Sequence, residues 1–239
     1  MKIVIAIPAY NEALILKRSI KKLFQFCADH LNEIESVIIV IANNNSTDET
    51  EVIANILAEK YDAVEHIFIP QKGKGLAVAT VWQKYEADLY VFMDADLATD
   101  LSAWPEALAQ IEAGAEVVVG SRFHKKSLVQ RSWQRRLISQ GYRWFFKTFF
   151  WLKINDFPCG FKMVTRPVRN QVVPEILNRG FFWDTELLVL AHKHGFKIVE
   201  IPVIWSEFAI DGRKSQVNLI PTSLNYIKES IKLRWRLWK

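Results

Sequence analysis

A short apolar run that ends in two aspartates is the feature that constrains this chain most. The run covers residues 89–93, and Asp94 and Asp96 follow it with only Ala95 between them. Such a run predicts a buried strand, and side chains two apart on an extended segment point the same way. Two carboxylates at the carboxyl end of a central strand suit a divalent ion, although the same pair also suits a strand end and a turn.

The first half of the chain alternates between short apolar runs and longer segments with helical periodicity. The predicted strands cover residues 3–7, 37–42, 64–70, 89–93 and 116–120, and the predicted helices cover 13–31, 47–60, 76–85 and 104–113. Ser46 and Glu49 have capping-box spacing, which predicts that the second helix starts at Thr47. This alternation is typical of βαβ units, so we expect an α/β fold with a mainly parallel sheet flanked by helices.

The composition indicates a folded chain without a disulfide framework. Half of the 239 residues are hydrophobic, which argues against disorder. The two cysteines, Cys27 and Cys159, are far apart in sequence, which favours a reduced cytosolic protein. No apolar run reaches the roughly 20 residues of a spanning helix, and the first strand is too short for a signal peptide. We expect a protein that can lie on a membrane without crossing it.

Positive charge gathers after residue 121. Residues 122–153 hold nine Lys or Arg and no Asp or Glu, interleaved with aromatic side chains. A helix over 128–152, with Gly141 as a candidate break, would carry two stripes on opposite faces. They are Trp133, Leu137, Phe145 and Phe149 on one face, and Arg131, Arg135, Arg143 and Lys147 on the other. Either the apolar stripe packs on the protein's own core, with the basic stripe in solvent, or it contacts an anionic membrane surface.

The rest of the chain predicts elements of both types. We expect strands over 159–164 and 197–204, and helices over 167–177, 184–194 and 221–239, the last of them basic. No G-x-G-x-x-G or P-loop follows the first strand, which disfavours a dinucleotide site. Polar turns at 8–12 and 43–48 follow the first two strands instead, and parallel strands present their carboxyl ends to one side. These turns should therefore meet the two aspartates in one crevice.

Five short motifs follow one another in order: PAYNE (8–12), NNNSTDET (43–50), GKG (73–75), DAD (94–96) and GSR (120–122). Together they resemble family 2 inverting glycosyltransferases with the GT-A fold. Three later segments, DFPCGFK (156–162), FWDTELL (182–188) and EIPVIW (200–205), are similar to dolichyl-phosphate glucosyl- and mannosyltransferases. The resemblance covers about residues 3–216. It implies a Rossmann-like GT-A sheet, with amphipathic helices toward the C-terminal half.

The resemblance also implies a domain plan. Residues 1–216 would form the catalytic domain, followed by a basic C-terminal helix over 217–239. Within the domain, residues 1–121 would be the nucleotide-sugar half, and residues 122–216 the acceptor half with the amphipathic helices.

By the same resemblance, the donor binds at the polar turns. Its nucleotide would be held by Pro8, Tyr10, Glu12, Asn43, Lys74, Asp94 and Ala95. Asp94 and Asp96 would bind Mg²⁺ or Mn²⁺ on the diphosphate, and Asp96 would also serve the reaction. Asn43 departs from the family's common Asp. An amide can still pair with a base as donor and acceptor, so the identity of the base stays open.

The candidate catalytic groups after residue 121 are mostly cations. Arg122, Arg213 and Lys214 are expected to stabilise the charge that develops on the leaving diphosphate. Asp156 resembles the family's acidic position beside the acceptor, where it would orient the acceptor or act as a base; a turn-forming Asp is the alternative. Glu186 is expected to bind donor hydroxyls or to be structural, and the histidines are expected to be surface or packing residues.

The expected reaction moves a hexose from a nucleotide sugar, of the UDP-glucose or GDP-mannose type, to a polyprenyl phosphate. This acceptor is already ionised near neutral pH, so it needs no general base. We expect the chain at the cytoplasmic face of a membrane, through peripheral contact or a membrane-protein partner, and without nucleic acid. Two rivals stay open: a hydroxyl acceptor served by Asp156 or Glu186 as base, or a non-catalytic basic protein that binds membrane or nucleic acid through residues 122–153.

Overall fold

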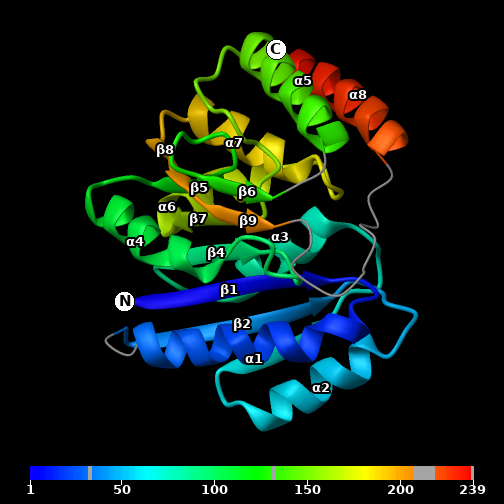
Figure 1. The fold of residues 1–239 in the computed structure, drawn as a ribbon, viewed down its shortest axis with the longest axis vertical. Helices are drawn as coiled ribbons and strands as arrows, with labels where there is room; N and C mark the ends of the chain where they lie inside the picture. Colours follow the sequence, from blue (N-terminus) through cyan, green and yellow to red (C-terminus); the bar gives the residue numbers. More distant parts are fainter. Residues whose placement is uncertain (32–33, 131–132, 207–218, 238–239) are drawn as a thin grey trace.

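A seven-stranded sheet forms the centre of the protein. The computed structural model describes residues 1–31, 34–130, 133–206 and 219–237 (Figure 1). The strand order is β3-β2-β1-β4-β7-β5-β8. The strands are β1 (Lys2–Ala9), β2 (Ser36–Asn43), β3 (Val64–Phe68), β4 (Leu89–Met93), β5 (Val117–Ser121), β7 (Phe161–Thr165) and β8 (Ile198–Pro202). Neighbours pair in parallel except β7, which is antiparallel to both β4 and β5. The predicted mainly parallel sheet is confirmed.

Helices cover both faces of the sheet, which is why β4 is apolar and buried along its whole length. One face is covered by α1 (Ala13–His30), α2 (Thr50–Lys60) and α4 (Trp104–Glu112). The other is covered by α3 (Lys74–Lys84), α6 (Arg166–Val172) and α7 (Trp183–Lys193). Short 3-10 turns, η1 (Leu101–Ala103) and η2 (Val173–Glu175), precede α4 and follow α6. The chain thus folds as three layers with a core on each side of the sheet.

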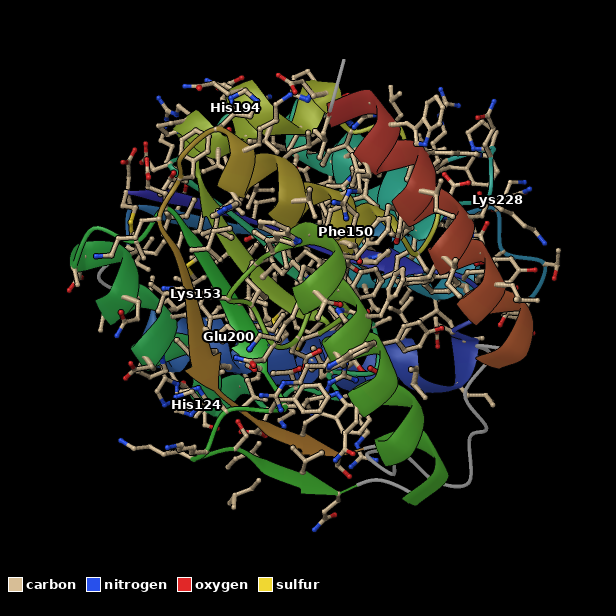
Figure 2. All side chains as sticks on the ribbon, turned by 90° about the horizontal axis from the view of Figure 1, so that it is seen from above. His124, Phe150, Lys153, His194, Glu200 and Lys228 are labelled. Atoms are coloured by element: carbon tan, nitrogen blue, oxygen red, sulfur yellow. The ribbon has the colours of Figure 1, made fainter. Side chains whose placement is uncertain are left out.

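Two further helices, α5 (Trp133–Phe150) and α8 (Leu219–Leu237), lie side by side over the α7 side of the sheet (Figures 1 and 2). The ring of Tyr226 on α8 lies 5.6 Å from the ring of Tyr142 and 6.1 Å from that of Phe146 on α5. Arg234 lies 4.7 Å above the ring of Phe149. The helix α5 continues through Gly141, so the candidate break is absent.

The predicted solvated basic stripe of α5 is wrong for its two described members. Arg143 and Lys147 both donate to the side-chain oxygen of Asn155, at 3.0 and 3.1 Å. This contact turns them toward the loop that precedes β7, while Trp144 is the exposed side chain beside them. Periodicity gave the angle between the stripes, but it did not reveal that a polar loop covers the basic side.

The helix α8 has apolar side chains on its outside as well as its inside. Tyr226 and Leu233 are buried against the core. The outer stripe of α8 consists of the exposed residues Leu224, Ile227, Ile231 and Trp235. Their spacing keeps them on one side of the helix. Among the described residues, no helix is both long and apolar enough to cross a membrane.

The predicted capping box before α2 is wrong. The helix begins at Thr50 rather than at Thr47. The hydroxyl of Ser46 accepts the backbone N–H of Asn11 at 3.0 Å, so it points toward the neighbouring turn. The carboxylate of Asp48 instead accepts the N–H of Thr50 at 3.0 Å. The side chain of Ser46 thus contacts the neighbouring turn instead of capping α2.

Two other boundaries differ from the prediction. Residues 128–130 start no helix but form the strand β6 (Leu128–Gln130), which pairs in parallel with β9 (Ile204–Ser206). The predicted strand over 197–204 is therefore divided between β8 and β9. A strand this short carries too little pattern to be separated from the helix that follows it.

Candidate active site

Two polar turns meet at the carboxyl edge of β1 and β2. The side-chain oxygen of Asn11 accepts the N–H of Thr47 at 2.8 Å. Asn11 has a φ of 54°, a left-handed conformation that Asn tolerates better than most residues. Pro8, Tyr10 and Glu12 lie at this edge and are partly exposed. The predicted convergence of the turns is present, and the base-binding roles of these residues remain predictions.

Asn43 lies at the end of β2 and is fully buried. Its side-chain oxygen accepts the N–H of Ser46 at 3.1 Å. This bond closes the turn that follows the strand. The neighbouring Asn44 accepts the N–H of Gly73 at 2.9 Å, which ties the same turn to the start of α3. Asn43 therefore shapes the turn, and contact with a base remains a prediction for it.

The turn before α3 carries Lys74 into the crevice. The N–H groups of Gly75 and Leu76 donate to the carbonyls of Gly180 and Arg179, at 3.2 and 3.0 Å. A Cβ added to Gly75 would lie 2.2 Å from the Cβ of Trp183. Only glycine allows this approach between α3 and α7. The close packing fixes where Lys74 leaves the helix.

Asp94 and Asp96 follow the end of β4, as predicted, but residues 95–96 form a turn, closed by the N–H of Leu97 on the carbonyl of Asp94 at 3.0 Å, rather than the expected extended backbone. The side chain of Asp94 crosses Gly160 so closely that a Cβ there would lie 1.8 Å from the carboxylate oxygen Oδ2. Asp96 accepts the N–H of Ala98 at 3.1 Å, and Ala95 between them is buried. Both aspartates are partly exposed.

Two lysines and two aspartates from four elements form one ion-pair chain. The ammonium of Lys74 lies 2.9 Å from Asp94 Oδ1 and 3.5 Å from Asp184 Oδ2. Asp184 Oδ1 in turn lies 2.9 Å from the ammonium of Lys162. Burial by itself lowers the pKa of Lys74, but the carboxylates of Asp94 and Asp184 outweigh it and raise that pKa. Lys74 is therefore charged at neutral pH.

A divalent ion fits the two aspartates at the end of β4. They offer hard oxygen ligands, which Mg²⁺ and Mn²⁺ prefer, and the missing Cβ of Gly160 makes room for the Asp94 carboxylate itself. No group of three or more His, Cys, Asp or Glu suited to a metal occurs among the described residues. Two protein carboxylates with ligands from a bound diphosphate are typical of Mg²⁺ sites.

Arg122 and Asp156 form a closed pair beyond β5. Arg122 donates Nε to Oδ2 and Nη2 to Oδ1 of Asp156, and its backbone N–H also donates to Oδ2, each at 2.8 Å. Asp156 is fully buried. Burial by itself raises the pKa of a carboxyl, but Arg122 outweighs it and holds the pKa of Asp156 below its usual value. Both carboxylate oxygens accept from Arg122, and the lowered pKa makes Asp156 a weak base.

A small pocket adjoins this pair on the side of α5. It is lined by Arg122, Phe123, Ser139, Tyr142, Arg143, Phe146, Asn155, Asp156, Phe157 and Pro158. Asp156 is the only carboxylate among these lining residues. Below the pocket, Glu200 accepts the backbone N–H groups of Asn155 and Asp156, each at 2.9 Å, and fixes the loop. The pocket thus combines cations with aromatic walls.

Glu186 has a structural role. It accepts the N–H groups of Leu177 and Asn178, at 3.0 and 2.9 Å, and pairs with Arg236 of α8. It therefore holds a loop and a helix rather than facing the crevice.

Two tryptophans and two histidines near the site make packing or local contacts. Trp183 packs edge-on against Trp82 at 5.3 Å in the core, and Trp205 lies under Arg122 at 5.2 Å. His124 and His194 lie toward opposite edges of Figure 2 and serve local contacts with Lys126 and Glu175. The expectation that the histidines are surface or packing residues fits these two.

Two residues at the site have no role predicted from the sequence, and two residues with a predicted role lie outside the described residues. Lys162 lies in the DFPCGFK segment and Asp184 in the FWDTELL segment. The resemblance of these segments implied no role for either residue. The available signal for Lys162 was a charged residue in an otherwise apolar strand. Arg213 and Lys214 lie outside the described residues, so their expected roles remain predictions.

Comparison with known proteins gives a consistent assignment. The family model for "Glycosyl transferase family 2" matches residues 4–169. The chain is 26% identical over 239 residues to "Glycosyltransferase AglD" of Haloferax volcanii, covering 99% of this chain and 38% of that protein. It is 29% identical over 255 residues to the dolichyl-phosphate beta-glucosyltransferase of Dictyostelium discoideum, covering 98% of this chain and 76% of that protein. The chain thus spans well under half of the first relative.

A solved structure shares the fold. Glucosyl-3-phosphoglycerate synthase from Mycobacterium tuberculosis, in complex with Mn²⁺, uridine-diphosphate and glucosyl-3-phosphoglycerate, superposes with a TM-score of 0.67 at 15% identity. The match covers 97% of this chain and 78% of that one. This likeness supports the predicted GT-A architecture. Since the family model covers more than half of its length, the chain belongs to glycosyl transferase family 2.

Proposed function

We propose that this chain transfers a hexose, with inversion, from a nucleotide sugar to a polyprenyl phosphate of the dolichyl type. The observation that carries the proposal is the acceptor pocket. Its one carboxylate, Asp156, has both oxygens bonded to Arg122, which lowers its pKa and makes it a weak base. A hydroxyl acceptor needs a general base. A phosphate monoester, with a second pKa near 6, does not.

In the proposed reaction, a phosphate oxygen of the acceptor attacks C1 of the hexose. The bond from C1 to the diphosphate oxygen breaks, and the nucleoside diphosphate leaves with the electron pair. Lys74 offsets charge on the diphosphate from the donor side, and Arg122 and Arg143 face the acceptor phosphate from the pocket. Mg²⁺ or Mn²⁺ held by Asp94 and Asp96 would supply further positive charge for the leaving group.

The similar proteins support the proposal in part. The relative from Dictyostelium discoideum is named a dolichyl-phosphate glucosyltransferase, and the solved structure above contains Mn²⁺ and a uridine nucleotide. We therefore place UDP-glucose first among the donors and GDP-mannose second.

The test is a transfer assay with matched acceptors. UDP-glucose and GDP-mannose are offered separately, with Mn²⁺ or Mg²⁺, to a short-chain polyprenyl phosphate and to the polyprenol of the same chain length. We expect metal-dependent product from one donor with the phosphate only. Product from the polyprenol, or release of free hexose alone, contradicts the proposed acceptor. Asp94→Asn should lose the product, whereas Asp88→Asn, at the opposite end of β4, should keep it.

We further propose that the chain contacts the cytoplasmic face of a membrane through the outer stripe of α8. The stripe is bordered by Lys228 and Lys232, which are exposed, and Trp144 and Trp151 are exposed on and just after the neighbouring helix α5. Aliphatic and Trp side chains bordered by lysine suit an anionic lipid surface.

Vesicle sedimentation tests this contact. We expect binding to vesicles that contain an anionic lipid, with weaker binding to purely zwitterionic vesicles. The double variant Ile227→Ser with Ile231→Ser should bind several-fold less. Val52→Ser with Ile56→Ser removes a similarly exposed pair at the same spacing from α2 and should bind like the wild type. Equal vesicle binding by the two double variants contradicts the assignment of the α8 stripe. If the wild type binds no vesicles, the result contradicts direct lipid contact and points to a membrane-protein partner.

A further inference from the structure

A lysine that has no part in the proposed function is buried at the centre of the molecule. Lys162 lies on β7 with its side chain fully buried. Its ammonium donates to the carbonyl of Cys159 at 2.7 Å and lies 2.9 Å from Asp184 Oδ1. A buried cation is costly unless it is paired, and Asp184 supplies the pairing charge.

Asp184 does more than neutralise Lys162. It stands in the first turn of α7, where the helix dipole favours an anion. Its second oxygen, Oδ2, faces Lys74 at 3.5 Å. Exposure rises along this chain of charges: the side chains of Lys162, Asp184 and Lys74 are 0%, 4% and 17% exposed. The buried Lys162–Asp184 pair is therefore linked to Lys74, the most exposed of the three side chains.

Lys74 has two carboxylate partners, and only Asp94 is also a proposed metal ligand. In the proposed function, Asp94 would hold a divalent ion. Its contact with Lys74, at 2.9 Å, must then weaken, because the ion and the ammonium carry the same sign of charge. Asp184 is held by Lys162 and remains as the anion beside Lys74.

We infer that Asp184, fixed by the buried Lys162, is a positioning residue that holds Lys74 at the donor diphosphate when Asp94 turns to the metal. The inference rests on the proposed function, because it needs a diphosphate in the crevice. It assigns the Lys162–Asp184 pair to binding of the nucleoside diphosphate, and not to contact with the hexose.

Calorimetric binding of UDP and of GDP, each with Mn²⁺ and without it, tests the inference. Asp184→Asn should weaken Mn²⁺-dependent binding of the preferred nucleoside diphosphate about tenfold, the size typical of residues that orient a ligand-binding group. In a Lys74→Met background the same change should have little further effect, because Asp184 acts through Lys74. Additive losses in the two backgrounds overturn the inference.

Folding is separated from positioning by the double variant Asp184→Asn with Lys162→Met. Removing both charges should restore thermal stability relative to Asp184→Asn alone, while nucleotide binding stays weak. If binding returns with stability, the pair is only structural and the inference fails. Asp88→Asn is the matched control, because Asp88 pairs with Arg166 through a partly exposed contact at the far end of β4.

The same measurements distinguish this inference from the proposed function. If the wild type binds neither UDP nor GDP, the proposed function fails, and this inference with it. If the wild type binds and Asp184→Asn binds equally well, only the inference fails. If Asp184→Asn weakens the nucleotide sugar but not the nucleoside diphosphate, Asp184 contacts the hexose directly, which also overturns it.

Discussion

The donor and acceptor sides of the proposed site are built on opposite plans. On the acceptor side, Arg122 and Asp156 use one another completely, through three bonds of 2.8 Å. On the donor side, Lys74 is shared between two carboxylates at 2.9 and 3.5 Å and is partly exposed. The Arg122–Asp156 pair is closed before any ligand binds, whereas Lys74 can exchange one carboxylate partner for the other.

Each side is therefore suited to a different task. A closed, buried pair keeps its geometry and so provides a fixed wall beside the cation Arg143 and the aromatic rings of the pocket. A shared lysine can follow the charge of a ligand that enters and leaves. Breaking the closed pair should therefore damage the fold first, whereas breaking the shared cluster should damage ligand binding and transfer first.

The largest effect is expected from Arg122→Met. This change leaves Asp156 charged, buried and unpaired, which should lower the free energy of unfolding by about 3–5 kcal/mol. Denaturant unfolding measures it, with Arg166→Met, which removes an exposed pair with Asp88, as the control. A loss below about 1 kcal/mol would show that the pair is not closed as described.

A smaller free-energy change is expected from Asp94→Asn. Transfer should fall about 100-fold, comparable to the loss of one group that stabilises transition-state charge, which corresponds to about 2.7 kcal/mol. Thermal unfolding should change little, because Asp94 is partly exposed. If Asp94→Asn lowers the free energy of unfolding as much as Arg122→Met does, the proposed difference between the two sides is contradicted.

Acid should weaken the closed pair by a measurable but smaller amount. The pKa of Asp156 is lower in the folded protein than in the unfolded chain, so the unfolded chain binds more protons once the pH falls through about 4. The advantage of the wild type over Asp156→Asn in free energy of unfolding should be full at pH 7. It should shrink below about pH 4, by at most about 1.4 kcal/mol per pH unit for one proton. A constant gap from pH 7 to pH 3 contradicts this coupling.

The smallest effect is expected from Trp205→Leu. The indole lies 5.2 Å from the guanidinium carbon of Arg122, and its removal should cost about 1 kcal/mol from lost cation–π contact, in addition to lost packing. A double-mutant cycle with Arg122→Met, which removes the cation, isolates the contact. A coupling energy near zero would mean that Trp205 only fills space.

The sequence predicted the donor side better than the acceptor side. The turns after β1, β2 and β4 could be placed together because parallel strands share a carboxyl edge, and that rule needs no side-chain detail. Arg143 and Lys147 were expected in solvent, and their contact with Asn155 depends on how α5 lies over a loop. Helical periodicity fixes angles around one helix, but it does not say which neighbour each side meets.

The ion-pair chain shows the same limit. Lys74 and Asp94 were identified as site residues by their motifs, whereas Asp184 and Lys162 join them only through contacts between α7, β7 and α3. Asp156 was left between base and turn residue. The pairing with Arg122 makes Asp156 a weaker base, and that pairing involves residues 34 apart in sequence.

The antiparallel strand β7 has a consequence for how the chain can fold. It enters the sheet between β4 and β5, although it follows β5 in sequence by about 40 residues. Within residues 1–121, β5 has no strand to pair with, because its described neighbours are β7 and β8. The centre of the sheet is thus completed late during synthesis, and β4 keeps an open apolar edge until then. Such long-range closure slows folding and exposes the growing chain to misassociation.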